Sequence, residues 1–592
     1  MIGKRYIEKI INTFTTFSDR NRVFILSIFV GIISGLAAIV LKSAVHFTQS
    51  MLQNAFPENT YNYLYLAFPL IGISLTVLYI KFFVKDDLSH GVSKILYSIA
   101  RENGKLKAHH TYSSIISSTL TVGFGGSVGL EAPITLTGSA IGSQLGSLFK
   151  LNNKSVITLV ACGSTAAVAA IFNAPVAGVV FAIEVLMLDL TTASIVPLLI
   201  SAVTATSISY IILGHGIMFS STRDVVNFEM TKLPFYVILG IFTGLYTVYF
   251  MRLSGRIEQF FKKIKKTYMR ILTGGILLSI LIFFFPSLYG EGYNSITAIL
   301  QDNINKLFIN SPFYSFRHDE YLLLAFLFAL LMLKTLATAF TTGAGGIGGV
   351  FAPSLFLGSI AGCFLAILLN TLFDLEVSVF NFTLAGMAGV MGSAMKAPLT
   401  AVFLIAEISG GYQLIVPLIL TVIVSYAVIY PFEQFSVYTK NLAKEGNLIT
   451  HHKDKHALSK MDVKDLIENN FTTLDPNSTL RDLVNTIAHS NRNIFPLVDE
   501  NRKFHGIVIL DDIRQIIFEP EKYDTVMAKD LSFFPAVFTN PDELIADVTV
   551  KFKESGLYNM IVLDEDNVYY GFVSRANLFS KYREIVEEIS ED

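Results

Sequence analysis

An internal repeat is the feature that most restricts how this chain folds. The stretch "GGSVGLEAPITLTGSAIG" (125–142) matches "GGIGGVFAPSLFLGSIAG" (345–362) at its glycines, at an Ala-Pro pair and at a Gly-Ser pair. Two shorter matches keep the same order along the chain: "VGIISGL" (30–36) with "LGIFTGL" (239–245), and "NAPVAGVVFAIE" (173–184) with "KAPLTAVFLIAE" (396–407). Three matches in one order indicate a duplication. We therefore predict two equivalent halves, about 23–215 and 232–438.

Both halves gather their apolar residues into long uncharged runs. The sequence is 52% hydrophobic and only 16% charged, whereas a soluble protein carries about 25% charged residues. Several runs reach or approach the roughly 20 residues that cross a bilayer; they are 23–40, 63–83, 195–213, 235–251, 275–285 and 321–337. We therefore predict an all-α polytopic membrane domain over 23–440, preceded by an amphipathic helix over 1–22 on the inner leaflet and followed by a soluble tail.

Composition excludes several classes of function. The net charge is -2, and the basic stripe of a nucleic-acid-binding protein is missing, so we predict no nucleic-acid partner. Cys162 and Cys363 lie far apart in apolar surroundings. We expect them to fill the core, and we predict no metal site and no disulfide framework.

The basic residues that flank the repeated helices indicate how the halves are oriented. Arg20 and Arg22 precede the first long helix, whereas "KKIKKTYMR" (262–270) follows its repeat partner. Lys and Arg mark the cytoplasmic side, so one copy starts inside and the other ends inside. Such inverted repeats place a substrate site at their interface near the membrane midplane. The alternative is a parallel duplication, which leaves both basic clusters unexplained.

Each long repeat predicts a broken helix whose N-terminus lies inside the protein. A glycine-rich linker runs into Pro133 in one half and Pro353 in the other; proline favours the first turn of a helix, and glycine lets backbone approach a ligand closely. A helix N-terminus has free N–H groups and attracts anions. Because neither stretch contains Lys or Arg, we predict a small anion bound by backbone N–H and hydroxyl groups.

Glu131 stands at the predicted start of the first broken helix. Ionised, its carboxylate would occupy the place of the anion; protonated, it would be free to leave. We therefore predict a gate that responds to pH and to anion occupancy, since ionisable groups within membrane segments mark functional sites. The alternative is a carboxylate that only caps the helix, but the second half has Phe351 at the equivalent position.

These stretches resemble the CLC family of chloride channels and chloride/proton exchangers. "GLEAP" (129–133) is similar to the family's G-x-E-G-P motif, and "GGVFAP" (348–353) to its G-x-F-x-P motif. The resemblance implies a homodimeric membrane protein, not an enzyme, with a chloride pathway in each subunit and Glu131 as the gate. It also implies that four residues of the two motifs bind chloride, namely Gly129, Leu130, Val350 and Phe351.

Two weaker matches add candidate chloride ligands. "SHGVSK" (89–94) resembles the family's G-S-G-I-P motif, with His90 in place of the central serine. Its imidazole either donates to the anion or is hydrogen-bonded into a helix turn away from the pathway. "SVYTKNL" (436–442) resembles the segment with the family's central tyrosine, which would be Tyr438; Tyr426 and Tyr430 are the alternatives.

One departure from the family concerns proton coupling. Exchangers often have an inner glutamate one residue beyond the position of Glu184, and here that residue is Val185. Passive conduction through a voltage- or pH-gated channel and chloride/proton exchange therefore both stay open. Glu184 and its repeat partner Glu407 are expected to be structural, as acceptors of backbone or hydroxyl hydrogen bonds.

The soluble tail resembles a pair of CBS domains, predicted at 461–520 and 521–592 after a linker over 441–460. In each unit strands alternate with a helix, and "FPLVDE" (495–500) corresponds to "MIVLDE" (560–565). CBS pairs often bind adenine nucleotides, and the weak candidates here are Asp512, Ser574 and Asn577. The linker histidines are predicted to be solvated rather than metal-bound; they are His451, His452 and His456.

Two other classes of function remain as alternatives. A CBS-regulated cation transporter, for example of magnesium, would need several acidic residues along its pathway, and the apolar region offers few. A membrane sensor that conducts nothing and signals through the tail is the other. Within the anion class, fluoride is an alternative substrate. We expect a bacterial inner membrane, with the N-terminus and the tail in the cytoplasm.

Overall fold

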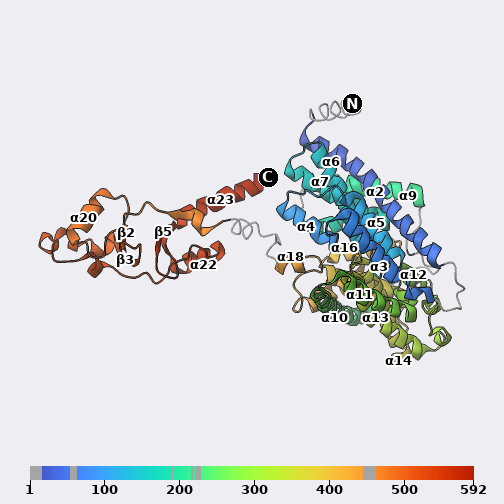
Figure 1. The fold of residues 1–592 in the computed structure, drawn as a ribbon. Coiled ribbons are helices and arrows are strands. Elements are labelled where there is room, and N and C mark those ends of the chain that lie inside the picture. The colour runs from blue at the N-terminus through green and yellow to red at the C-terminus, as the bar shows by residue number, and fades with distance from the viewer. Residues whose placement is uncertain are drawn as a thin grey trace. The chain divides into compact units, whose positions relative to one another are not determined.

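In the computed structural model the chain forms two compact units, residues 1–448 and 449–592 (Figure 1). The structure describes residues 17–53, 63–187, 192–214, 219, 229–444 and 461–591. Most of the helix predicted over 1–22 lies outside these ranges, as do the linker histidines His451, His452 and His456.

The N-terminal unit is built of helices that follow the two predicted halves. The first half contains α2 (Asp19–Gln53), α3 (Phe68–Tyr79), α4 (Gly91–Arg101), α5 (His110–Gly123), α6 (Glu131–Leu148), α7 (Asn153–Phe172), α8 (Pro175–Val185) and α9 (Thr192–Leu213). The second contains α10 (Leu233–Lys263), α11 (Thr267–Phe284), α12 (Tyr293–Leu300), α13 (Glu320–Gly343), α14 (Phe351–Phe373), α15 (Val379–Met395), α16 (Pro398–Ile408) and α17 (Ile415–Ile429), and α18 (Lys440–Lys444) follows. Among the described residues, seven helices are long and apolar enough to cross a membrane.

The shortest repeat forms two equivalent helix crossings. Helix α2 packs against α9, and α10 packs against α17. A Cβ on Gly31 would lie 2.8 Å from the carbonyl oxygen of Ser201, and one on Gly240 would lie 3.0 Å from that of Thr421. Glycine at these positions therefore lets the helices of each pair approach closely, as small residues do in membrane helix packing.

Some glycines of the long repeat serve the same purpose. Where α6 crosses α7, a Cβ on Gly138 would lie 2.1 Å from the carbonyl oxygen of Gly163. Where α14 crosses α15, a Cβ on Gly358 would lie 2.4 Å from the carbonyl oxygen of Gly386. These contacts leave no room for a side chain, so the tight crossing behind each broken helix requires glycine.

The C-terminal unit contains two antiparallel strand pairs with helices. Strands β2 (Ile494–Val498) and β3 (Phe504–Ile509) form one sheet, and β1 (Ile467–Glu468), β5 (Tyr569–Ser574) and β4 (Asn559–Leu563) form the other in that order. The helices are α20 (Leu480–His489), α21 (Leu510–Ile513), α22 (Ile545–Ser555) and α23 (Arg575–Glu591). Helix α20 starts at a capping box of Thr479 and Asp482. The predicted α/β character of the tail is confirmed.

Candidate functional site

The linkers before α6 and α14 meet at two equivalent residues of the long repeat. The N–H of Gly129 donates to the carbonyl of Gly349 at 2.8 Å, and the N–H of Gly349 donates to the carbonyl of Gly129 at 2.8 Å. Just before them, Gly125 and Gly345 have φ angles of 99° and 105°. This left-handed conformation favours glycine, so the repeated glycines set the turn that brings the two helix ends together.

Both helix ends are open to a ligand. The residues before the first helical turns, Leu130 for α6 and Val350 for α14, make no side-chain capping hydrogen bond. The first N–H groups of a helix have no partner within the helix, so they are available to an acceptor. The predicted meeting of two broken helices at one place is therefore present.

Glu131 belongs to α6, but its carboxylate contacts the other half of the protein. The side chain is buried, with the residue 1% exposed. Its Oε2 accepts a hydrogen bond from the N–H of Ala352 in the first turn of α14 at 3.4 Å, and its Oε1 accepts one from the hydroxyl of Tyr293 at the start of α12. The carboxylate thus occupies the positive end of the opposite helix, where an anion would be stabilised.

Aromatic rings surround this carboxylate. Phe351 is fully buried and stacks on Phe172, with ring centroids 5.3 Å apart. Phe172 and Phe219 both contact the ring of Tyr293, at 6.4 and 6.0 Å. Such rings exclude water, and exclusion of water strengthens the attraction between a helix end and a negative charge.

Two charged groups near the site were missed by sequence reasoning. Glu291 interacts electrostatically with Glu131, Lys42 and Lys334. Lys334 on α13 is fully buried, and its Nζ donates to the carbonyl of Gly290 at 3.0 Å. Glu291 could have been found by the signal that revealed Glu131, because it is a single acid in the apolar stretch "YGEGYNSI" (289–296). Tyr293, in the same stretch, carried no motif.

The backbone around His90 approaches the site, whereas its ring points elsewhere. A Cβ on the next residue, Gly91, would lie 2.8 Å from the carbonyl oxygen of Ala132, so α4 begins beside the first turn of α6. The His90 side chain is 49% exposed, and its Nε2 lies 3.7 Å from the carboxylate of Glu258 on α10. Among the described contacts of Glu131, none involves the His90 imidazole.

Tyr438 lies in the same region as Glu131. It is buried, its carbonyl accepts a hydrogen bond from Ser93 Oγ at 2.7 Å, and it interacts electrostatically with Glu131. The alternatives Tyr426 and Tyr430 instead face the ammonium of Lys396, at 4.6 and 5.8 Å from their ring centroids. The structure therefore brings Tyr438, rather than either alternative, near the two helix ends.

The repeated glutamates Glu184 and Glu407 cap helices of opposite halves. Glu184 accepts hydrogen bonds from the N–H groups of Leu399 at 3.0 Å and Thr400 at 2.7 Å, at the start of α16. Glu407 accepts from the N–H groups of Val176 at 3.1 Å and Ala177 at 2.8 Å, at the start of α8. Their expected role as acceptors is confirmed, and the bonds join the two halves.

The arrangement of facing helix ends agrees with a family profile. Residues 71–430 match the profile described as "Voltage gated chloride channel". The chain belongs to the voltage gated chloride channel family. Residues 463–519 also match the profile of the CBS domain, so this member carries a CBS region in its tail. The family resemblance of the sequence motifs is thereby confirmed.

Individual members of the voltage gated chloride channel family resemble this chain over most of their length. An H(+)/Cl(-) exchange transporter ClcA of Vibrio cholerae is 26% identical over 417 residues, covering 67% of this chain and 84% of the relative. The crystal structure of a slow cyanobacterial Cl-/H+ antiporter superposes with a TM-score of 0.61 at 25% identity, covering 72% of this chain and 97% of that one. A eukaryotic CLC transporter shares the fold at 16% identity, with a TM-score of 0.58 over 94% of this chain and 98% of that one. The predicted fold class, a CLC-like membrane domain followed by a CBS region, is confirmed.

In the tail, two of the three nucleotide candidates lie together. The Ser574 hydroxyl donates to the carboxylate of Glu468, and the Asn577 N–H donates to Ser574 Oγ at 3.1 Å. Arg492 donates to the same carboxylate at 2.9 Å. Asp512 is exposed on α21, beside the other sheet. The described contacts therefore join Ser574 and Asn577 but not Asp512.

Proposed function

We propose that this protein moves chloride across a membrane through its N-terminal unit and that Glu131 gates the pathway. The observation that carries the proposal is the hydrogen bond between the Glu131 carboxylate and the Ala352 N–H at the end of α14. A carboxylate and a halide are both small anions, so a helix end that binds one also suits the other.

The gate works by competition between two anions for the same N–H groups. At high pH Glu131 is ionised and held by Ala352 and Tyr293. On protonation it loses the charge that the helix end attracts, and chloride takes its place. Backbone groups of Gly129, Leu130, Val350 and Phe351 then surround the ion, with Tyr438 on the way in or out. Because backbone dipoles replace full positive charges there, the ion also leaves readily.

The proposal leaves one choice, between conduction and exchange. Val185 is 4% exposed and has no titratable group, so this chain lacks an acid at the position next to Glu184. Relatives with the fold include a chloride/proton antiporter and an exchange transporter. We propose gated chloride movement as the common activity, with proton coupling to be decided by measurement.

Flux measurements on liposomes test the proposal. Chloride efflux and proton uptake are followed at several pH values for the unmodified chain and for E131Q, with fluoride and Mg²⁺ as alternative ions. We expect chloride efflux that rises as the pH falls, and E131Q to conduct without pH dependence and without proton movement. Retained pH dependence in E131Q would refute the gate; flux of Mg²⁺ instead of chloride would refute the substrate class. No flux of any ion would favour the sensor alternative.

We also propose a homodimer in an inner membrane, with the N-terminus and the tail in the cytoplasm, and a second CBS domain over 521–592. The Ser574–Glu468–Arg492 contacts support a regulatory role for the tail, in which an adenine nucleotide competes for these side chains. Thermal unfolding of the full chain with and without ATP, compared with S574A, tests this. A shift that ATP produces equally in S574A would contradict a site at Ser574.

A further inference from the structure

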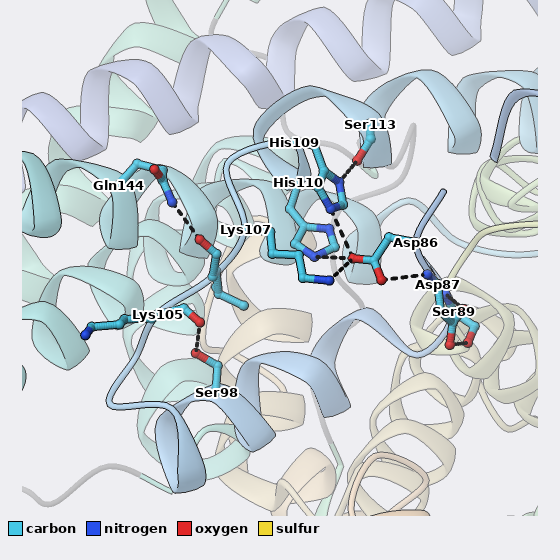
Figure 2. Close-up of polar contacts among 11 residues, drawn as sticks. Asp86, Asp87, Ser89, Ser98, Lys105, Lys107, His109, His110, Ser113 and Gln144 are labelled. Atoms are coloured by element: carbon cyan, nitrogen blue, oxygen red, sulfur yellow. Dashed lines mark hydrogen bonds and ion pairs between the residues drawn. The ribbon is translucent and has the colours of Figure 1, made fainter. Parts of the chain in front are cut away.

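A cluster of three metal-ligating side chains lies outside the anion site. Asp86 follows the short helix η2 (Ile80–Val84), and His109 and His110 stand at the start of α5. Figure 2 shows both imidazole rings reaching the carboxylate of Asp86. The Nε2 atoms of His109 and His110 lie 3.0 and 3.9 Å from Asp86 Oδ2, and the potential ligand atoms all lie within 4.8 Å of one another.

A hydrogen bond fixes the ring of His109 for such a role. The hydroxyl of Ser113, one turn later on α5, lies 3.1 Å from His109 Nδ1 (Figure 2). A serine hydroxyl donates or accepts, so it suits either tautomer of the ring. When it accepts from Nδ1–H, Nε2 presents its lone pair toward Asp86. Histidine ligands of metals are usually held in this way by a partner on the second nitrogen.

His110 provides an independent sign that a ligand belongs here. The residue is 3% exposed, and its Nδ1 is buried without a hydrogen-bond partner. Its Nε2 is aimed at Asp86 but lies beyond hydrogen-bond distance at 3.9 Å. Burial of a polar ring without hydrogen bonds costs free energy, and a bond from Nε2 to a metal ion would offset that cost.

We propose that Asp86, His109 and His110 bind a divalent transition-metal ion, with Zn²⁺ as the best match. Two imidazoles and one carboxylate form a common three-ligand set for zinc, with water at the fourth position. Mg²⁺ and Ca²⁺ fit less well because they prefer oxygen ligands. The bound ion would join the segment before α4 to α5, four residues from His90 at the start of α4.

Lys107 competes with the ion for Asp86. Its Nζ lies 3.0 Å from the same oxygen, Oδ2, and its side chain is 68% exposed. This ammonium is therefore free to swing into solvent when a metal ion takes its place. Its removal should strengthen metal binding, whereas it should not do so if the cluster is only a set of ion pairs.

Zinc titration of the full chain in detergent tests the proposal. The linker histidines His451, His452 and His456 are first changed to glutamine, so that they do not contribute. In this background we expect one Zn²⁺ per chain, binding at least about tenfold weaker in H109Q, H110Q and D86N, and several-fold tighter in K107A. Co²⁺ in place of zinc should give the visible absorption of a tetrahedral site, lost in H109Q.

Two controls separate a metal site from a structural cluster. Each variant is unfolded thermally without metal, so that loss of fold is recognised. S113A should weaken zinc binding while leaving the metal-free protein folded. Zinc binding that disappears with the linker histidines, or that is the same in K107A and in H109Q as in the background, would overturn the proposal. Because K107A is an exposed change, its result decides even if the histidine variants do not fold.

Discussion

Gly129 and Gly349 exchange both of their backbone hydrogen bonds, each N–H donating to the other's carbonyl at 2.8 Å. The two residues hold equivalent places in the long repeat, so the pairing is reciprocal, as expected where two similar halves meet around a two-fold axis. The pair sets the distance between the starts of α6 and α14. The site at Glu131 depends on that distance, since the carboxylate of one half is bound by the helix of the other.

Substitution of Gly129 should therefore disrupt the gate. A Cβ there would lie 2.1 Å from Glu131 Oε2 and 3.0 Å from the Ala352 nitrogen. Overpacking of this kind costs about 1–3 kcal/mol, and it displaces the carboxylate from Ala352. We expect chloride efflux from liposomes to lose its dependence on pH in G129A. Gly255 is the matched control, since a Cβ there meets nothing within 4 Å; a G129A variant that behaves like G255A would contradict the role of the glycine pair.

Removal of the Tyr293 hydroxyl should make the gate open at higher pH. The hydroxyl donates to Glu131, and a hydrogen bond to a charged group contributes about 1.5–3 kcal/mol. Its loss destabilises the ionised carboxylate, so protonation and opening occur at a higher pH. We expect Y293F to raise the pH midpoint of efflux by about 1 unit or more. A midpoint that stays in place or falls would show that the tyrosine does not hold the gate closed.

Neutralisation of Glu291 should have the opposite effect. Glu291 and Glu131 interact electrostatically, and a neighbouring negative charge opposes ionisation of a carboxyl group. In E291Q the ionised form of Glu131 becomes easier to reach, so we expect the pH midpoint of efflux to fall. E320Q changes an exposed acid at the start of α13 and serves as the control. Equal effects of the two changes would mean that Glu291 acts only through the net charge.

The glutamates that join the two halves should affect stability rather than gating. Glu184 accepts hydrogen bonds from both the N–H and the hydroxyl of Thr400, each at 2.7 Å. An amide accepts these bonds less strongly than a carboxylate, and we expect E184Q and E407Q each to lose about 1–2 kcal/mol of stability. Thermal unfolding in detergent measures the loss, while the pH midpoint of efflux should stay unchanged. A shifted midpoint would assign these residues to the pathway instead.

Parts of the site could be predicted because they are local patterns. The Gly-Pro stretches state where two helices begin, and the repeat states that they are equivalent. A single acid in an apolar stretch identified Glu131, and the same rule would have identified Glu291. The ring of His90 shows the limit, because its match to a motif placed the backbone near α6 but carried no information about Glu258, which the imidazole faces.

The sequence by itself determined the duplication, the broken helices, the membrane class and the CBS-like tail, because periodic and repeated residues express these properties directly. Only the tertiary structure decided which groups meet at the gate. Glu131 contacts Tyr293 and Ala352, which are 162 and 221 residues away along the chain. Hydrogen bonds over such separations depend on how helices cross, and the crossing follows from the packing of many glycines and aromatic rings together rather than from any one stretch.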